Sequence, residues 1–383
     1  MVITHYRGQA VADQFQKRLE ALGIKVYRHY IIPDYPSNVS LIVSDDGFGK
    51  NDFIETERSL VVVTAPGPGS GKMATCLSQL YHEHKRGVKA GYAKFETFPV
   101  WNLPLKHPVN LAYEAATADL DDVNMIDPFH LEAYGKTTVN YNRDVEIFPV
   151  LDAMFRRIYG ESPYKSPTDM GVNMIGFCIS DDAVCCEAAK QEIIRRYYTT
   201  ACAVHQGFSD AVETRRIELV MSSAGLSSAD RPVVAAALDR AAATGAPAMS
   251  IQLADGRIIA GKTSSLLGAA SACLMNALKA LAGIDKKMLL IPPSIIEPIQ
   301  HLKVEHMGNH NPRLHTDELL IALSICAVTN PIAGYAIDQL EKLRGCEAHS
   351  TVILSHVDQE QFKKLGVNLT CEPRYQAKKL FHK

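Results

Sequence analysis

A run of valines, a glycine-rich turn and a helix-forming segment follow one another between residues 61 and 77. The turn contains the residues that we expect to bind phosphate, namely Gly67, Gly69, Ser70, Gly71 and Lys72. A helix N-terminus attracts anions because its first N–H groups lack partners and its dipole favours negative charge there. The order of strand, glycine turn and helix therefore predicts a site for a phosphate group or a nucleotide.

The turn departs from the nucleotide-binding pattern G-x-x-x-x-G-K-[ST] at two positions. Pro66 stands where the pattern has its first glycine, and Met73 stands where it has the hydroxyl that holds magnesium. Pro66 and Pro68 also remove two N–H donors from the turn. Magnesium-ATP bound in the usual way is therefore not expected. An anion site is the preferred interpretation, and a full nucleoside triphosphatase and a simple packing turn remain the alternatives.

A second segment, residues 256–263, fits the same pattern letter for letter. Its variable positions include Ile258 and Ile259, which favour a strand over an open loop. The pair Asp255-Gly256 is a hairpin turn signal between two strand-like runs. We interpret this second match as accidental and place it on a β-hairpin.

Alternating strand-like and helix-like segments predict a doubly wound, mostly parallel α/β sheet that includes the P-loop-like turn. Strands are expected at residues 2–4, 24–27, 39–43 and 61–64. Sheets of this kind bind ligands beyond the carboxyl ends of their strands, which is where the glycine-rich turn would lie.

The chain divides into three predicted parts. Residues 1–125 form an α/β domain of phosphate-binding type that looks N-terminally incomplete, because the chain begins almost inside its first strand. Residues 126–245 are mostly helical and form a helical domain, as their apolar periodicity indicates. Residues 246–383 form a second, smaller α/β subdomain, with strands expected at 250–253, 257–260, 288–291, 351–354 and 367–370.

Composition excludes several classes of partner. The 383 residues carry a formal net charge of −2, which gives no electrostatic reason to expect nucleic acid or an acidic membrane surface. No apolar run is long enough to cross a bilayer, and no segment resembles a signal peptide. The nine cysteines include no C-x-x-C pair, so we expect reduced thiols and a cytoplasmic location.

Polar residues near predicted strand ends are the candidates for chemistry. Lys94 and Glu96 follow the helix after the turn and would face the same crevice as Lys72, unless their strand simply ends in solvent. Asp127 follows two apolar residues, as a magnesium-binding strand end does, although Asp-Pro is also a common turn. Arg143 could clamp an anion, or lie in an exposed loop. We assign Glu96 and Asp127 as catalytic, and Lys94 and Arg143 as substrate-binding.

Histidines and carboxylates gather near residue 310, namely His301, Glu305, His306, His310, His315, Asp317 and Glu318. Such residues suit zinc, but no H-E-x-x-H motif is present and Pro312 limits how the segment can fold. We therefore expect no metal and interpret residues 308–315 as an ordered loop before a helix. In this loop Arg313 and His315 are candidates for binding a substrate acid or phosphate.

A family resemblance rests on the stretches TAPGPGSGKMATCLSQLYHEHK, VNMIDPFHLEAYG, YKSPTDMGVNMIG, GNHNPRLHTDE and CEAHSTVILS. They are similar to one uncharacterised bacterial family, domain of unknown function eighteen-forty-six. The resemblance covers nearly the whole chain and implies an α/β domain, a helical insertion and a C-terminal α/β subdomain. It also implies that other members have an extra N-terminal segment that this chain lacks. The family brings no established activity, so no catalytic residue is carried over.

The leading hypothesis is a cytoplasmic enzyme, a transferase or hydrolase, that binds a nucleotide or phosphorylated metabolite at the 67–72 turn. The alternatives are a non-catalytic nucleotide-binding regulatory protein, and a metal-dependent hydrolase that uses the 301–318 histidines. We expect a small phosphate-bearing ligand and a homo-oligomer, with no nucleic acid or membrane partner. The cofactor stays open, with a nucleotide and Mg²⁺ as the candidates.

Overall fold

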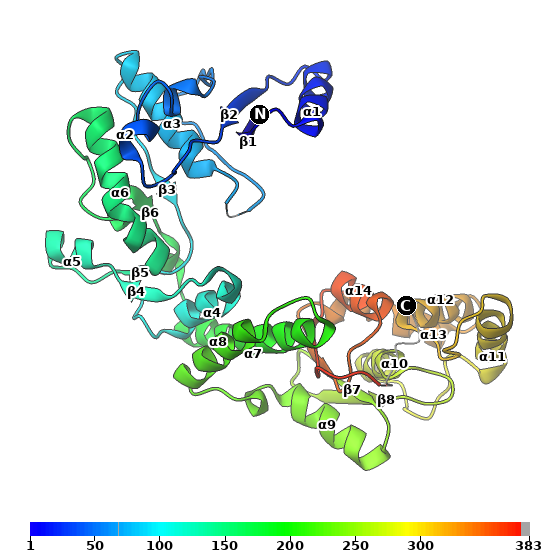
Figure 1. The fold of residues 1–383 in the computed structure, drawn as a ribbon. Helices are drawn as coiled ribbons and strands as arrows, with labels where there is room; N and C mark the ends of the chain where they lie inside the picture. Colours follow the sequence, from blue (N-terminus) through cyan, green and yellow to red (C-terminus); the bar gives the residue numbers. More distant parts are fainter. Residues whose placement is uncertain (68, 377–383) are drawn as a thin grey trace. The chain divides into compact units, whose positions relative to one another are not determined.

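The computed structural model describes residues 1–67 and 69–376, which form two compact units (Figure 1). The units are built from Met1–Leu105 with Asp122–Ser180 (unit 1) and from Lys106–Asp121 with Asp181–Lys383 (unit 2). Pro68 of the glycine-rich turn lies outside the described residues. The predicted three-part division after residues 125 and 245 is not tested by this grouping and stays a prediction.

Unit 1 contains short strands and three helices of 12, 14 and 18 residues among its described elements. Its elements are β1 (Val2–Tyr6), α1 (Ala10–Ala21), β2 (Tyr27–Tyr30), α2 (Val39–Ile42), η1 (Phe48–Lys50), α3 (Lys72–Lys85), β3 (Lys94–Phe95), β4 (Asn124–Ile126), α5 (Pro128–Tyr134), β5 (Val139–Tyr141), α6 (Asn142–Tyr159), η3 (Thr168–Met170), β6 (Gly171–Val172) and η4 (Ile175–Cys178). Three separate two-stranded sheets form, of which β1–β2 and β3–β6 are parallel and β4–β5 is antiparallel.

The prediction of a doubly wound sheet is wrong, because the described strands of unit 1 form only two-stranded sheets. Residues 39–43 contain a helical turn, because the Asn38 side chain accepts the Leu41 N–H and Ile42 is fully buried. Residues 61–64 have β-branched side chains but no strand partner, and Val62 is 79% exposed. What the structure supports is a mixed α/β protein whose described sheets in unit 1 are small.

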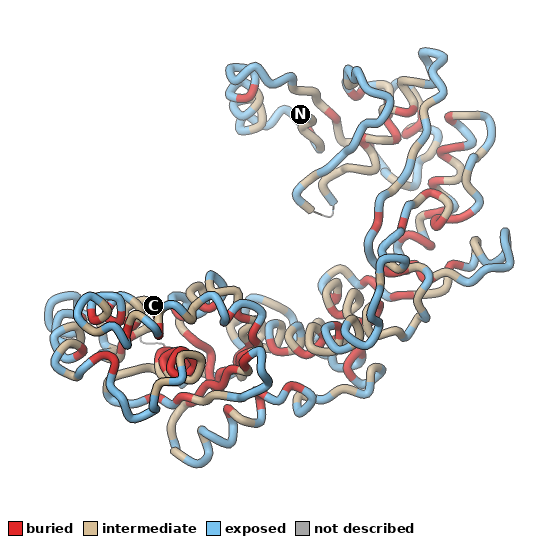
Figure 2. The backbone as a smooth tube through the Cα atoms, turned by 180° about the vertical axis from the view of Figure 1, so that it is seen from behind, coloured by how far each residue is buried: buried red, intermediate tan, exposed pale blue. Residues whose placement is uncertain are grey.

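The core of unit 1 is formed by α3 and α6. Phe148, Leu151, Phe155 and Ile158 recur at helical spacing on α6 and are buried, as the sequence predicts. They belong to one apolar cluster with Leu77 of α3, which fixes the helix that follows the glycine-rich turn. Figure 2 colours the buried positions along the backbone red.

Unit 2 combines a helical part with a four-stranded sheet. Its elements are α4 (Pro108–Ala116), η2 (Ala118–Leu120), α7 (Asp182–Gln206), α8 (Ala211–Ser223), η5 (Ser228–Asp230), α9 (Pro232–Thr244), β7 (Ala248–Gln252), β8 (Ile258–Lys262), α10 (Ala269–Ala282), α11 (Pro293–His301), η6 (Leu302–His306), α12 (Thr316–Ala327), α13 (Pro331–Ile337), η7 (Leu340–Leu343), β9 (Glu347–Ser350), α14 (His356–Lys364) and β10 (Asn368–Cys371). The helical part packs α4 and α8 against α7 around one apolar cluster.

The sheet of unit 2 has the order β10-β9-β7-β8, with β10 and β9 parallel and β7 antiparallel to both of its neighbours. Successive side chains of β7 point to opposite faces of the sheet. Ser250 donates to the Val233 carbonyl of α9, whereas Met249 and Ile251 join the core that includes α10. Because helices cover both faces, β7 is buried almost throughout.

The hairpin interpretation of residues 256–263 is confirmed. β7 and β8 pair antiparallel, and Gly256 in the connection has φ +84°. The predictions of strands at 288–291 and 351–354 are wrong, because neither segment forms a strand. The strand next to the second segment, β9, ends at Ser350. None of the helices among the described residues has the length and apolar character needed to cross a membrane.

Candidate functional site

The glycine-rich turn closes on itself directly before α3. Gly69 and Gly71 have φ +69° and +85°, in the left-handed region that glycine tolerates best. The Lys72 ammonium donates to the Gly67 carbonyl at 2.9 Å, and the Ser70 hydroxyl donates to the same oxygen at 2.5 Å. The lysine therefore lies back across the turn, with its charge on a neutral carbonyl.

The end of the turn is held against β1. The Thr4 hydroxyl donates to the Ser70 carbonyl at 3.0 Å, and a Cβ built on Gly71 would lie 3.1 Å from the Thr4 methyl carbon. Gly71 is the N-cap of α3 and has no side chain to accept the first helical N–H groups. The turn thus combines a fixed backbone, a lysine and an N-terminus that no cap side chain satisfies.

A buried lysine–carboxylate cluster lies in the same unit. Lys94 of β3 contacts the Glu96 and Asp144 carboxylates, each at 2.5 Å, and its ammonium donates to the Tyr141 hydroxyl at 2.6 Å. Glu96 and Asp144 are buried, while Lys94 is partly exposed. We refer to Lys94, Glu96, Tyr141 and Asp144 as the Lys94 cluster.

Charge in the Lys94 cluster is set by burial and by close partners. Burial alone would lower the pKa of Lys94, but Asp144 and Glu96 raise it above its ordinary value, so the ammonium stays charged. Burial raises the pKa of Glu96, and the negative charge of Asp144 raises it further, while Lys94 opposes both. Glu96 is therefore a carboxylate of this cluster that takes up a proton more readily than a free glutamate.

Tyr92 packs in the apolar core of unit 1 beside the helix that follows the turn. Its pKa is raised by burial first, then by Cys76 of α3, and it is also affected by Lys94, Asp144 and Glu96. The side chain of Tyr92 belongs to the same apolar cluster as Leu77 of α3.

Asp127 and Arg143 are engaged in local contacts. Asp127 is fully buried as the N-cap of α5, where it accepts the His130 N–H at 3.0 Å and the Thr168 hydroxyl at 2.6 Å. These contacts agree with the alternative that Asp127-Pro128 forms a turn. The catalytic role of Asp127 stays a prediction. Arg143 forms a two-pronged ion pair with Asp122, in which one Nη lies 2.8 Å from a carboxylate oxygen.

The predicted substrate residues of the C-terminal part lie in unit 2, whereas the turn lies in unit 1. Arg313 donates to the Ser264 carbonyl at 2.8 Å. The His315 ring nitrogen lies 2.9 Å from the Asp358 carboxylate, whose hydrogen bond raises the pKa of His315. Both side chains thus have protein partners, and their role toward a substrate stays a prediction.

The histidines between 301 and 315 are not gathered into a three-ligand site in the described part of the chain. The rings of His301 and His306 face each other edge-on at 5.4 Å between centroids, and His315 is engaged with Asp358. Among the residues that the structure describes, the one group of three closely spaced metal-ligating side chains is His107, Asp182 and Cys186.

Sequence reasoning missed two members of the Lys94 cluster, Tyr141 and Asp144. The polar run at residues 140–144 suggests a site only through its arginine, yet Asp144 in the first turn of α6 is the carboxylate that contacts Lys94. A buried position for Asp144 is signalled by its spacing, because Asp144 and Phe148 are four residues apart on one helical face.

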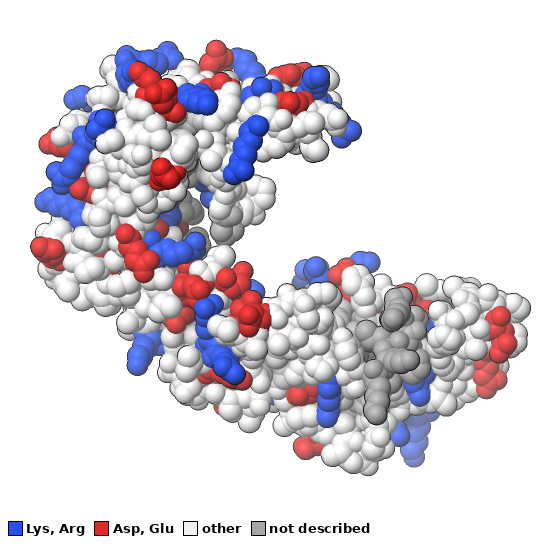
Figure 3. All heavy atoms as spheres, in the orientation of Figure 1, with Lys and Arg blue, Asp and Glu red and all other residues white. Residues whose placement is uncertain are grey.

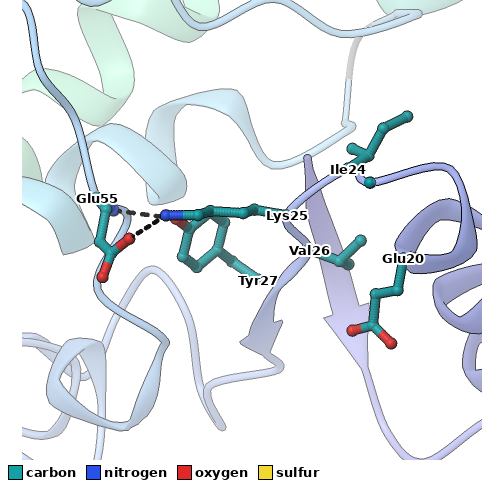
Figure 4. A pocket seen from close by; sticks show the side chains of 7 residues that line it. Glu20, Ile24, Lys25, Val26, Tyr27 and Glu55 are labelled. Atoms are coloured by element: carbon teal, nitrogen blue, oxygen red, sulfur yellow. Dashed lines mark hydrogen bonds and ion pairs between the residues drawn. The ribbon is translucent and has the colours of Figure 1, made fainter.

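A surface depression of about 430 Å³ lies elsewhere in unit 1 and includes none of the predicted site residues (Figure 4). Exposed Lys25 and Glu55 form an ion pair at its edge. On the face drawn in Figure 3, basic and acidic side chains are interspersed. We assign no function to the depression, because its Lys25–Glu55 ion pair is exposed to solvent.

Fold and site together define a mixed α/β protein with a lysine-closed glycine turn and a buried lysine–carboxylate cluster in its first unit. The chain belongs to the family described as domain of unknown function DUF1846, with the N-terminal domain matched at residues 1–225 and the C-terminal domain at residues 229–381. The expected family is thereby confirmed. The match to the N-terminal domain starts at residue 1 and does not bear out the expectation of a missing segment, on which it says nothing further.

Relatives in other bacteria are similar along almost the whole chain. A UPF0371 protein of Corynebacterium urealyticum is 60% identical over 373 residues, which cover 97% of this chain and 75% of that protein. A UPF0371 protein of Streptococcus thermophilus is 58% identical over 383 residues, which cover 100% of this chain and 78% of that protein. Neither name indicates an activity.

Proposed function

We propose that the 67–72 turn binds the phosphate group of a nucleotide or phosphorylated metabolite, and that the protein is a cytoplasmic enzyme. The observation that supports this proposal is the Lys72 ammonium lying on the Gly67 carbonyl at the start of α3. A phosphate oxygen is a stronger partner for an ammonium than a neutral carbonyl, so an incoming phosphate displaces Gly67 from Lys72. The first N–H groups of α3 then contact the same phosphate.

Glu96 is the proposed general base. Its raised pKa brings it closer to neutral pH, where a base combines the correct protonation state with sufficient proton affinity. In a phosphoryl transfer or hydrolysis, the attacking hydroxyl passes its proton to Glu96 as its oxygen bonds to phosphorus and the bond to the leaving oxygen breaks. Lys94 holds the Glu96 carboxylate in place through the 2.5 Å contact.

The experiment is titration calorimetry of ATP, GTP, AMP and inorganic phosphate into the wild-type protein and two lysine variants. Lys72→Ala should weaken binding of the tightest ligand by roughly ten- to a hundredfold, as expected for a lost charge-assisted contact. Lys262→Ala is the matched control, because this lysine completes the letter-perfect pattern but lies on the β8 strand. Equal affinities for wild type and Lys72→Ala, or a loss only at Lys262, would refute the assignment.

Turnover separates the enzyme from the regulatory alternative. Each ligand that binds is incubated with the protein, alone and with a panel of small hydroxyl-bearing acceptors, and phosphate release or transfer is measured. Glu96→Gln should retain binding and lose turnover if Glu96 is the base. Binding without any turnover by the wild-type protein would assign the site to a non-catalytic nucleotide sensor.

A further inference from the structure

Three metal-ligating side chains meet where α4 and α7 begin in unit 2. His107 is the N-cap of α4, and Asp182 and Cys186 lie one helical turn apart at the start of α7. The His107 Nε2 atom lies 3.0 Å from an Asp182 carboxylate oxygen and 3.5 Å from the Cys186 sulfur. The Cys186 sulfur lies 3.6 Å from the other Asp182 oxygen.

The two distances from the Cys186 sulfur match the edges of a zinc coordination tetrahedron. With zinc–sulfur bonds of about 2.3 Å and zinc–nitrogen or zinc–oxygen bonds of about 2.0–2.1 Å, tetrahedral ligands lie about 3.3–3.6 Å apart. The Cys186 sulfur lies 3.5 Å from the His107 nitrogen and 3.6 Å from one Asp182 oxygen, whereas the nitrogen lies 3.0 Å from the other oxygen. With one ligand atom taken from each residue, the three atoms lie within 4.8 Å of one another. Only the His107–Asp182 pair is closer than this range, and that pair forms a direct hydrogen bond that a cation would open.

A nucleophilic cysteine fits the geometry less well than a metal site does. In a Cys–His–Asp arrangement for catalysis, the carboxylate holds one imidazole nitrogen and the thiol contacts the other. Here Asp182 and Cys186 both contact Nε2 of His107. Burial and the Asp182 carboxylate also raise the pKa of Cys186, which disfavours a free thiolate.

We propose that His107, Asp182 and Cys186 bind a zinc-type divalent cation, with water as the fourth ligand. An imidazole, a thiolate and a carboxylate together are a ligand set that zinc accepts. The Asp182 side chain is 62% exposed, so the site is open to solvent on that side. The site lies in unit 2 and is separate from the histidines near residue 310, for which no metal is expected.

Metal binding moves two protons. The Cys186 thiol releases its proton to solvent when the sulfur–metal bond forms. The imidazole of His107 must carry its proton on Nδ1, which without the cation accepts the Val109 N–H at 3.3 Å. That hydrogen bond is longer than the usual range, so its loss is a small cost. Because the thiol proton is displaced, affinity for the cation should fall as pH falls.

The test uses Co²⁺ as a spectroscopic substitute for zinc in the full chain after removal of bound metal with a chelator. The wild-type protein should show a thiolate-to-cobalt charge-transfer band, and added Zn²⁺ should abolish it. Cys186→Ser should lose the band, whereas Cys185→Ser, which changes the neighbouring thiol outside the ligand set, should keep it. Lys72→Ala should leave the spectrum unchanged, because the proposed phosphate site is independent of this one.

Asp182→Asn provides a second readout that does not depend on the thiol. Its side chain is largely exposed, so the variant should fold, keep the charge-transfer band and bind Co²⁺ at least tenfold more weakly. The proposal is overturned if the wild-type protein shows no band at micromolar cobalt, if Cys186→Ser retains the band, or if Cys185→Ser loses it. Should Cys186→Ser fail to fold, an unchanged cobalt affinity in Asp182→Asn overturns it.

Discussion

The glycines of the 67–72 turn differ in what their backbone positions require. Gly67 has an ordinary φ and open space where a Cβ would lie, and Gly69 has a positive φ with open space. Gly71 has a positive φ and lies close to Thr4. Three alanine substitutions along one turn therefore separate the cost of backbone strain from the cost of a steric contact.

Gly71→Ala is expected to destabilise unit 1 by about 2 kcal/mol, because alanine in the left-handed region costs about 1–2 kcal/mol and the Thr4 contact adds to it. Gly69→Ala should cost less, since strain acts there alone, and Gly67→Ala should be close to neutral. Urea unfolding of the three variants measures the series. An equal cost at all three positions would mean that the turn has a different conformation in solution.

Lys94 is the cation that pairs with two buried carboxylates, Glu96 and Asp144. Lys94→Met leaves Glu96 and Asp144 without it, and breaking a buried ion pair in this way costs roughly 3–5 kcal/mol. Lys25→Met is the control, because the Lys25–Glu55 pair is exposed and its loss should leave stability unchanged. Denaturant unfolding compares the two variants, and an equal loss would contradict the buried character of the Lys94 cluster.

At the scale of elements, one carboxylate joins two helices in unit 2. Asp358 of α14 accepts the N–H and hydroxyl of Thr316, the first residue of α12, and it also contacts His315 and Ser355. Burial would raise the pKa of Asp358, but His315 and these hydrogen bonds lower it. The start of α12 is therefore tied to α14 by one charged acceptor.

The His315–Asp358 contact predicts a pH dependence of the stability of unit 2. The pKa of His315 is raised above its ordinary value near 6.5, chiefly by the hydrogen bond to Asp358. Its contribution is therefore complete below about pH 6.5 and is lost as pH rises through the raised pKa of the folded state. The free energy of unfolding should fall by about 1 kcal/mol across that interval.

His315→Gln should remove this slope, because glutamine can still donate to Asp358 but does not titrate. His356→Gln, which changes an exposed histidine at the start of α14, should keep the slope of the wild-type protein. Urea unfolding at a series of pH values from 5.5 to 8.5 is the measurement. A slope that survives in His315→Gln would place the titrating group elsewhere.

Local signals predicted elements well where the determinants lie close in sequence. Asp255-Gly256 predicted the β7–β8 hairpin, and the periodicity of Phe148, Leu151, Phe155 and Ile158 predicted α6. The strand prediction for residues 61–64 was wrong, because β-branched side chains favour strands only where a partner strand is available. In residues 39–43 the Asn38 cap and the burial of Ile42 prevailed over strand propensity.

The candidate site was predicted only in part for a similar reason. Lys94 and Glu96 are two residues apart, so their shared location follows from the chain itself. Tyr141 and Asp144 reach Lys94 from 47 and 50 residues away, and no spacing rule relates positions so distant in the sequence. His107 reaches Cys186 across 79 residues in the same way.

At the scale of the whole molecule, the two units are interleaved along the chain. Residues 106–121 belong to unit 2, although the segments on both sides of them belong to unit 1. This inserted segment carries α4, whose Leu111 and Ala115 are buried in one cluster with Ile193 and Ile194 of α7. Removing α4 therefore exposes part of the core of unit 2.

A fragment of residues 181–383 is expected to keep the protected sheet around β7 but to lose protection in α7 and α8. Fully burying one leucine contributes about 1.5–3 kcal/mol, and α4 also covers further apolar side chains of α7. A synthetic peptide of residues 106–121 added to the fragment should restore amide protection in α7, whereas the same peptide with Leu111→Asp should not. Hydrogen exchange is the measurement. Full amide protection of α7 in the fragment alone would show that α4 is not needed for the stability of α7. In that case the contacts of α7 with α8 and β10 would be sufficient to stabilise it.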